Sequence, residues 1–130
     1  MRITATALSL NVAEPITSAT FLIDHFGFAE DMADDGFVSL SRSDAGFSVI
    51  YLRTGLKTFK PERIAGSAGE GTLVVFVVDA IDDEYRRLQE EGVRIETPIE
   101  TEPWGERYFQ VLGPNGIVIQ LVQWMTPETE

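Results

Sequence analysis

The sequence has no cysteine and only one histidine, His25, among its 130 residues. The lack of cysteine excludes a disulfide framework and any chemistry that needs a thiolate. Basic residues are also scarce, since 10 Lys and Arg face 21 Asp and Glu, and the formal net charge is −11. This charge disfavours nucleic acids and anionic membranes as partners, because both carry the same sign. It would attract cationic ligands.

Long apolar runs are missing as well. The longest, residues 73–78, is far shorter than the roughly 20 residues that a membrane-spanning helix needs. The first residues lack a basic segment followed by an apolar one, which is the pattern of a signal peptide. We therefore expect a cytoplasmic protein with no membrane partner, and the length indicates a single domain, residues 1–130.

His25 raises the question of catalysis, because histidine is the usual acid or base near neutral pH. It lies at the end of a predicted helix, in the run Asp24-His25-Phe26-Gly27. A cation there interacts favourably with the negative end of the helix dipole. We favour this structural interpretation over a catalytic one.

The first half of the chain has a clear order of elements. Leu8, Leu10 and Val12 alternate with polar or small residues, which predicts a half-buried strand. Pro15 opens a helix that Gly27 ends. A strand-like region begins at Phe28, residues 37–40 and 47–53 are predicted strands, and the glycine-rich segment 54–71 is a predicted loop.

The pattern then restarts at an offset of 65 positions, where Leu73 matches Leu8 and Gly92 matches Gly27. Each half therefore has the order β-α-β-β-β, and the fold class is α+β. We predict module one at 5–53, a linker loop at 54–71, module two at 72–124 and a tail at 125–130. A half this small cannot cover its own apolar face, so we expect the modules to pack together or against another chain.

The segment Pro103–Trp124 predicts a β-hairpin, with strands on both sides of the turn Gly113-Pro114-Asn115-Gly116. It also resembles the glyoxalase/bleomycin-resistance/extradiol-dioxygenase superfamily, whose members are also called vicinal oxygen chelate proteins. The resemblance rests on Pro-Trp-Gly, on Arg107 and Phe109, and on Pro-Asn-Gly followed by Ile-Val-Ile-Gln-Leu. It covers nearly the whole chain, and it implies paired β-α-β-β-β modules whose sheets curl around a concave site.

The resemblance also implies where a divalent metal would be held, by His or Glu from the first and last strand of each module. The matching positions here are Ala7, Tyr51 or Ile50, Thr72 or Leu73, and Gln120. These side chains cannot form a tight zinc or iron site, because such metals need imidazole or carboxylate ligands. We therefore predict no metal and no cofactor.

The remaining side chains on the predicted concave face are aromatic and amide groups. Such a surface suits a flat organic ligand. The predicted ligand-binding residues are Phe47, Tyr51, Arg53, Phe76, Trp104, Gln120 and Trp124. For Phe47 and Phe76, packing in the core is the alternative interpretation.

The functional prediction is a metal-independent protein that binds a drug or aromatic metabolite. It resembles the branch of the superfamily that sequesters antibiotics as a homodimer and so confers resistance. Its expected partner is a small aromatic or cationic ligand. One alternative is an enzyme of the same fold, a metal-dependent lyase, isomerase or dioxygenase, or one in which Tyr51 or Glu106 does acid–base work. A third hypothesis is that Lys57, Lys60 and Arg63, with Arg53, recruit an anionic metabolite.

Overall fold

The computed structural model describes residues 1–56 and 65–125. Lys57, Lys60 and Arg63, which the sequence suggests as an anion-recruiting loop, lie outside the described residues. The chain divides into two compact units, Met1–Ala68 and Gly69–Glu130, and each is described by itself. Among the described residues, none of the helices has the length and apolar character that crossing a bilayer requires.

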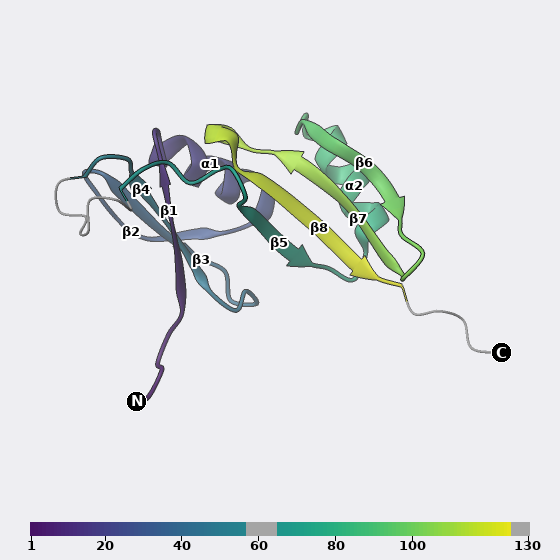
Figure 1. The fold of residues 1–130 in the computed structure, drawn as a ribbon, viewed down its shortest axis with the longest axis horizontal. Coiled ribbons are helices and arrows are strands. Elements are labelled where there is room, and N and C mark those ends of the chain that lie inside the picture. Colours follow the sequence, from purple (N-terminus) through teal and green to yellow (C-terminus); the bar gives the residue numbers. More distant parts are fainter. Residues whose placement is uncertain (57–64, 126–130) are drawn as a thin grey trace. The chain divides into compact units, whose positions relative to one another are not determined.

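Unit 1 is a four-stranded sheet with one helix against it (Figure 1). The strand order is β1-β4-β3-β2, in which β1 runs parallel to β4 and the other neighbours are antiparallel. Its elements are β1 (Ala7–Val12), α1 (Pro15–Phe26), β2 (Ala29–Asp34), β3 (Phe37–Ser41) and β4 (Ser48–Arg53).

The limits of α1 follow from its sequence. Pro15 occupies the first turn, where its missing N–H has no helical partner to lose. Gly27 ends the helix in the left-handed region at φ 69°. The backbone N–H groups of Gly27 and Phe28 donate to the carbonyls of Ile23 and Leu22, which closes the last turn. The predicted helix is confirmed.

One face of the sheet of unit 1 is the core. Leu10, Tyr51 and Val38 are neighbours across β1, β4 and β3, and each is at most 5% exposed. The helix lies against β3 and β4 and contributes the buried Ala19 and Leu22. Within the described part of unit 1, the opposite face has no helix on it and carries the other parity of each strand.

Unit 2 repeats this arrangement with the strand order β5-β8-β7-β6 (Figure 1). The strand β5 runs parallel to β8, and the remaining neighbours are antiparallel. Its elements are β5 (Leu73–Val77), α2 (Ile81–Glu90), β6 (Ile95–Thr101), β7 (Glu106–Leu112) and β8 (Val118–Trp124). The α+β class and the β-α-β-β-β order of both halves are confirmed.

The hairpin of β7 and β8 turns through a short 3-10 helix, Pro114–Gly116. Asn115 and Gly116 both have positive φ, at 60° and 73°. These are the residue types that adopt this conformation most readily. The N–H of Gly113 donates to the carbonyl of Ile117 at 2.8 Å, which closes the turn. The predicted turn is confirmed, and it fixes the pairing of the strands on either side.

The first strand and the helix of unit 2 each begin 66 positions after their counterparts in unit 1, whereas the sequence predicts an offset of 65. The predicted value holds only at Gly27 and Gly92, because α2 reaches its glycine one residue earlier than α1. A slip of one residue reverses the faces of a strand. Val75 therefore lies on the helix-free side and is 40% exposed, whereas its predicted match, Leu10, is buried.

The helix α2 covers one face of the sheet of unit 2. The ring of Tyr85 in α2 packs edge-on against the ring of Phe109, with 4.8 Å between the ring centroids, and Phe109 is fully buried. Arg107, on the same side of β7, pairs with Asp82 of α2 at 2.6 Å. The opposite surface is the helix-free face of unit 2, and cross-strand pairing places these residues on it: Val75, Glu106, Tyr108, Gln110, Gln120, Val122 and Trp124.

Candidate functional site

The helix-free face of unit 2 carries a chain of hydrogen-bonded polar side chains. Thr97 of β6 donates its hydroxyl to Oε1 of Gln110 on β7 at 2.9 Å. Gln110 donates from Nε2 to Oε1 of Gln120 on β8, also at 2.9 Å. Gln120 is only 8% exposed, so its amide must be hydrogen-bonded to avoid a large desolvation cost. The chain crosses three strands and supplies those bonds.

This series of hydrogen bonds ends at the carboxylate of Glu106, which also accepts a hydrogen bond from the indole of Trp104. Gln120 donates from Nε2 to Oε2 of Glu106 at 3.5 Å, the outer limit for such a bond. Trp104 donates from Nε1 to the other oxygen, Oε1, at 3.1 Å. Trp104 is 63% exposed, and Trp124, which pairs with Glu106 across the ladder, is 55% exposed. The two tryptophans are the only ones in the sequence.

A tight loop presents Trp104 to solvent. Gly105 follows it with φ 97°, a conformation that side chains other than hydrogen strongly disfavour. The carbonyl of Gly105 accepts from the N–H of Met125 at 2.8 Å, which ties the loop to the end of β8. A Cβ on Gly105 would lie 2.7 Å from the carbonyl oxygen of Met125. Only glycine fits here, and this explains the Trp-Gly pair in the sequence.

Tyr108 lies on the same face with two carboxylates around its hydroxyl. The hydroxyl is 3.0 Å from Oε1 of Glu100 and 3.2 Å from Oε1 of Glu102. The hydrogen bond to Glu100, together with partial burial and the bond to Glu102, raises the pKa of Tyr108 to about 12. The phenol keeps its proton at neutral pH and is a hydrogen-bond donor rather than a base.

The structure brings three of the predicted ligand-binding residues together. Trp104 and Gln120 both hydrogen-bond to Glu106, and Trp124 pairs with Glu106 across the ladder. Phe76 pairs with Leu121, in the row that faces α2, and so lies on the opposite side of the same sheet. Ligand contact by these four residues stays a prediction.

The other three predicted residues belong to unit 1. Tyr51 is 3% exposed on the face that packs against α1, and burial raises the pKa of its hydroxyl to about 12. Arg53 is exposed and pairs with Asp35 at 3.1 Å. Phe47 precedes β4 and is half-buried. Their contact with a ligand also stays a prediction.

Gln110 and Thr97 are residues of this face that the sequence-based prediction did not include. Pairing the strands of the hairpin would have identified Gln110 only in the observed register, because a turn limited to residues 113–116 pairs Gln110 with Ile119 rather than with Gln120. Thr97 could not be found in this way, because β6 carries register shifts between Ile95 and Glu100. Such irregularities break the simple alternation of faces.

The donor set does not fit the metal that the resemblance implies. On the helix-free face of unit 2, the hydrogen-bonded series that includes Gln120 contains one carboxylate, two amides and a hydroxyl. In unit 1 the matching strands offer Ala7 and either Ile50 or the buried Tyr51. Across residues 1–56 and 65–125, no three His, Cys, Asp or Glu side chains gather as a metal site would require.

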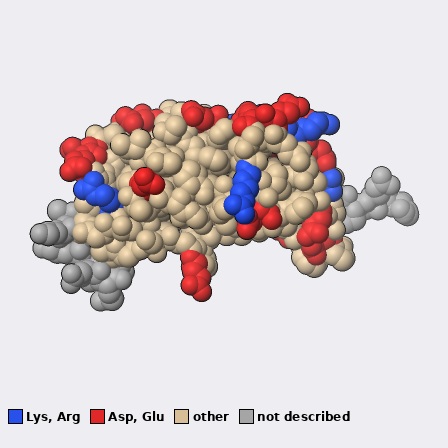
Figure 2. All heavy atoms as spheres, turned by 90° about the horizontal axis from the view of Figure 1, so that it is seen from above, with Lys and Arg blue, Asp and Glu red and all other residues tan. Residues whose placement is uncertain are grey.

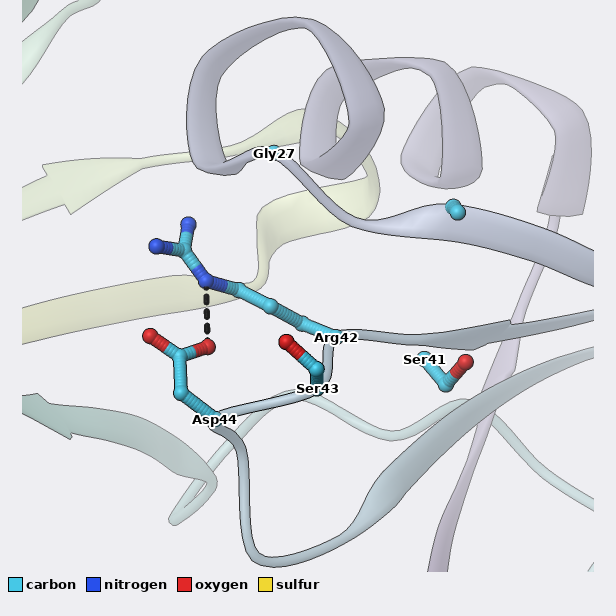
Figure 3. Close-up of a pocket in the computed structure, with 6 residues that line it drawn as sticks. Gly27, Ser41, Arg42, Ser43 and Asp44 are labelled. Atoms are coloured by element: carbon cyan, nitrogen blue, oxygen red, sulfur yellow. Dashed lines mark hydrogen bonds and ion pairs between the residues drawn. The ribbon is translucent and has the colours of Figure 1, made fainter.

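Unit 1 also has an open hollow of about 530 Å³ between the end of α1 and the turn after β3 (Figure 3). Its two charged lining residues pair with each other, since Arg42 donates to Asp44 at 2.6 Å and also to the carbonyl of Phe26 at 2.5 Å. The bond to Asp44 lowers the pKa of that carboxyl, and the bond to Phe26 satisfies a carbonyl of the last helical turn. The guanidinium is therefore engaged in structure, and the hollow is a weaker candidate than the helix-free face of unit 2.

The charge predicted from composition is visible on the surface. Acidic side chains are spread over the face shown in Figure 2, and basic ones occur at isolated places. His25 lies in the last turn of α1, with its ring 5.0 Å from that of Phe21. This placement agrees with the structural interpretation of His25.

Comparison with known proteins gives a family match over most of the chain. The model of the Glyoxalase/Bleomycin resistance protein/Dioxygenase superfamily matches residues 3–121. No curated protein matches at a significant level. A glyoxalase/bleomycin resistance protein/dioxygenase from Nocardioides is 22% identical with a TM-score of 0.81, and the match covers 99% of this chain and 88% of that one.

Two further solved structures are similar at the level of the fold. TioX from Micromonospora sp. ML1 is 22% identical with a TM-score of 0.71, over 95% of this chain and 100% of that one. TnmS3, an antibiotic binding protein from Streptomyces sp. CB03234, is 22% identical with a TM-score of 0.72, over 95% of this chain and 98% of that one.

Proposed function

We propose that this chain, which belongs to the Glyoxalase/Bleomycin resistance protein/Dioxygenase superfamily, is a metal-independent protein that binds a planar small molecule. The ligand is a drug or an aromatic metabolite, and it binds on the helix-free face of unit 2. The observation that carries the proposal is a pair of exposed indoles, Trp104 and Trp124, next to the carboxylate of Glu106, which also contacts the buried amide of Gln120.

The two exposed tryptophans are the first support for a binding site on this face. Each presents a large apolar ring to water, and such rings are enriched where a ligand or partner covers them. The polar chain beneath them supplies a few fixed donors and acceptors at Gln110, Gln120 and Glu106. Apolar walls with a few convergent polar groups are the usual composition of a small-molecule site.

Metal independence is supported by the donor set. Gln120 stands where the superfamily resemblance implies a metal-binding Glu, and its Oε1 already accepts from Gln110 at 2.9 Å. A neutral amide engaged in this way is a poor ligand for zinc or iron. The chemistry that remains is binding by stacking and hydrogen bonding.

The biological role that follows is sequestration of a toxic compound in the cytoplasm. TnmS3, of similar fold, is an antibiotic binding protein. The net charge of −11 favours a cationic ligand and speeds its association. We further propose a homodimer, because Leu73, Val75 and Val77 are 43%, 40% and 67% exposed on the edge strand β5.

A panel of planar drugs and aromatic metabolites tests the proposal. The purified protein is treated with a chelator and screened by thermal melting, and hits are titrated by calorimetry. A compound that binds raises the melting temperature by mass action. Expression of the chain in a sensitive bacterium should then raise the tolerated concentration of that compound. Binding that requires added zinc or iron would contradict the proposal.

A further inference from the structure

We infer that Glu106 selects a protonated nitrogen on the ring system that binds beside Trp104 and Trp124. The inference rests on the proposed function and specifies the class of its ligand: a planar aromatic cation that carries an N–H donor. Three observations support it. The side-chain hydrogen bonds all run toward Glu106, and the carboxylate of Glu106 can accept further bonds. Among the described residues, no cation forms an ion pair with Glu106.

The chain of hydrogen bonds runs in one direction. An ionised carboxylate only accepts, so Glu106 obliges Gln120 to turn its amide nitrogen toward it. The amide oxygen of Gln120 then points at Gln110, which must donate, and the oxygen of Gln110 in turn accepts from Thr97. The donors along these bonds are therefore all directed toward Glu106.

The carboxylate of Glu106 can accept more hydrogen bonds than the described residues donate to it. Two oxygens offer about four lone-pair sites. Within the described chain, Oε1 accepts from Trp104 and Oε2 accepts weakly from Gln120, at 3.1 Å and 3.5 Å. Glu106 is only half-buried, so its remaining sites are open to a ligand.

Nothing in the described residues neutralises this charge. The neighbouring cation along the strand, Arg107, points to the other side of the sheet and pairs with Asp82 at 2.6 Å. The ion pairs formed within residues 1–56 and 65–125 do not include Glu106. A half-buried anion with no counter-ion in this part of the chain, flanked by exposed indoles, favours a ligand that brings the cation with it.

The test compares two rings of similar shape and different charge. Proflavine is a protonated diaminoacridine near neutral pH, and acridine is mainly neutral under mildly alkaline conditions where proflavine keeps its proton. Both are titrated calorimetrically into the full chain and into Glu106→Gln. Glu100→Gln is the matched control, because it removes the same charge from the same end of β6 and β7 without touching Trp104 or Gln120.

The wild-type chain should bind proflavine about tenfold more tightly than acridine, since a charge-assisted hydrogen bond is worth about one decade. Glu106→Gln should remove most of that preference, and Glu100→Gln should keep most of it. Glu106→Ala provides a second removal of the carboxylate, and the inference requires the same loss there. Melting temperatures of the variants check that each is folded.

Several results would overturn the inference. If Glu106→Gln keeps the preference, or if Glu100→Gln loses it equally, the selectivity comes from the overall charge of the protein. If the wild type binds both rings equally, ring binding stands and the role of Glu106 is wrong. If neither ring binds, the proposed function fails and this inference fails with it.

Discussion

At the scale of single residues, the site depends on side chains that sequence alone can name but cannot orient. Trp104 and Gln120 both hydrogen-bond to Glu106 on the helix-free face of unit 2. The sequence assigns Tyr51 to the same kind of surface, yet it is buried against α1. The run Phe-Ser-Val-Ile-Tyr-Leu-Arg is apolar at both parities of β4. Alternation therefore cannot decide which face of that strand is the core.

Trp104→Ala separates ligand stacking from packing. The ring is 63% exposed, so its removal should change the free energy of unfolding by about 0.5 kcal/mol or less. Affinity for proflavine should fall about tenfold, because stacking and cation–π attraction together amount to about one decade. Calorimetry and a thermal melt on the same variant measure the two effects.

The control for that experiment is Met32→Ala. Met32 is 61% exposed on β2 in unit 1, so it has an apolar surface of similar exposure far along the chain. Its removal should leave ring affinity unchanged. A large drop in melting temperature with unaltered affinity in Trp104→Ala would show that the indole serves packing instead.

The tyrosines predict a pH dependence at alkaline pH. Burial raises the pKa of Tyr51 to about 12, and hydrogen bonding to Glu100 raises the pKa of Tyr108 to about 12, from an ordinary value of 10.0. Above pH 10 the unfolded chain releases these protons and the native state retains them. The stability they contribute is therefore present below pH 10 and is lost as the pH rises toward 12.

Spectrophotometric titration of tyrosinate checks this prediction. Tyr51→Phe and Tyr108→Phe should each remove one of the late transitions, and denaturant melts should show a falling free energy of unfolding over the same range. Ionisation of Tyr51 at its ordinary pKa in the folded protein would contradict its burial.

At the scale of the elements, the sequence predicts the order and type of the helices and strands but not all of the registers. Gly27, Pro15 and the turn at residues 113–116 are strong signals, because their backbone geometry suits few other residues. The predicted repeat offset is wrong by one in β5, where Leu-Val-Val-Phe-Val is apolar throughout. A strand without polar positions has no alternation of polar and apolar residues. Its pairing with β8 is therefore needed to show which of its side chains face the helix.

Replacing Gly105 should strain the loop before β7 and destabilise the protein. Gly105→Ala places a Cβ 2.7 Å from the carbonyl oxygen of Met125 and forces alanine to φ 97°. Backbone strain of this kind costs about 1 to 3 kcal/mol. Denaturant melts should show that loss, and calorimetry should show weaker ring binding because Trp104 is displaced.

Gly46→Ala is the matched control for that change. Gly46 lies in the turn between β3 and β4, and an added Cβ would meet no atom within 4 Å. Stability and ring affinity should both stay close to those of the wild type. Equal losses in the two variants would mean that the Gly105 loop has no special constraint.

At the scale of the whole molecule, composition limits the partners and the chemistry that the chain can have. The charge of −11 disfavours nucleic acids, and the lack of cysteine excludes thiol chemistry. The family match over residues 3–121 confirms the resemblance that the hairpin motif indicates. Oligomeric state is a property that neither composition nor a single chain contains, so the homodimer stays a prediction.

The proposed homodimer has a direct test. Light scattering should give a mass of about twice the 14.4 kDa of one chain in the micromolar range. Val77→Glu should shift the mass toward the monomer, because it places a charge on the exposed edge strand β5. Ile3→Glu is a control outside the strands at an apolar position that is 71% exposed. A wild-type mass of 14.4 kDa at every concentration would refute the dimer.

We propose that a planar ligand binds beside Trp104 and Trp124 without a metal. The most direct measurement is the tryptophan fluorescence of chelator-treated Trp104→Phe and Trp124→Phe during titration with proflavine. Each variant keeps one of the two indoles, so each reports from one side of the site. We expect saturable quenching in both variants, and the quenching should be unchanged when zinc is restored. Quenching that appears only after zinc is added, or in neither variant, would contradict it.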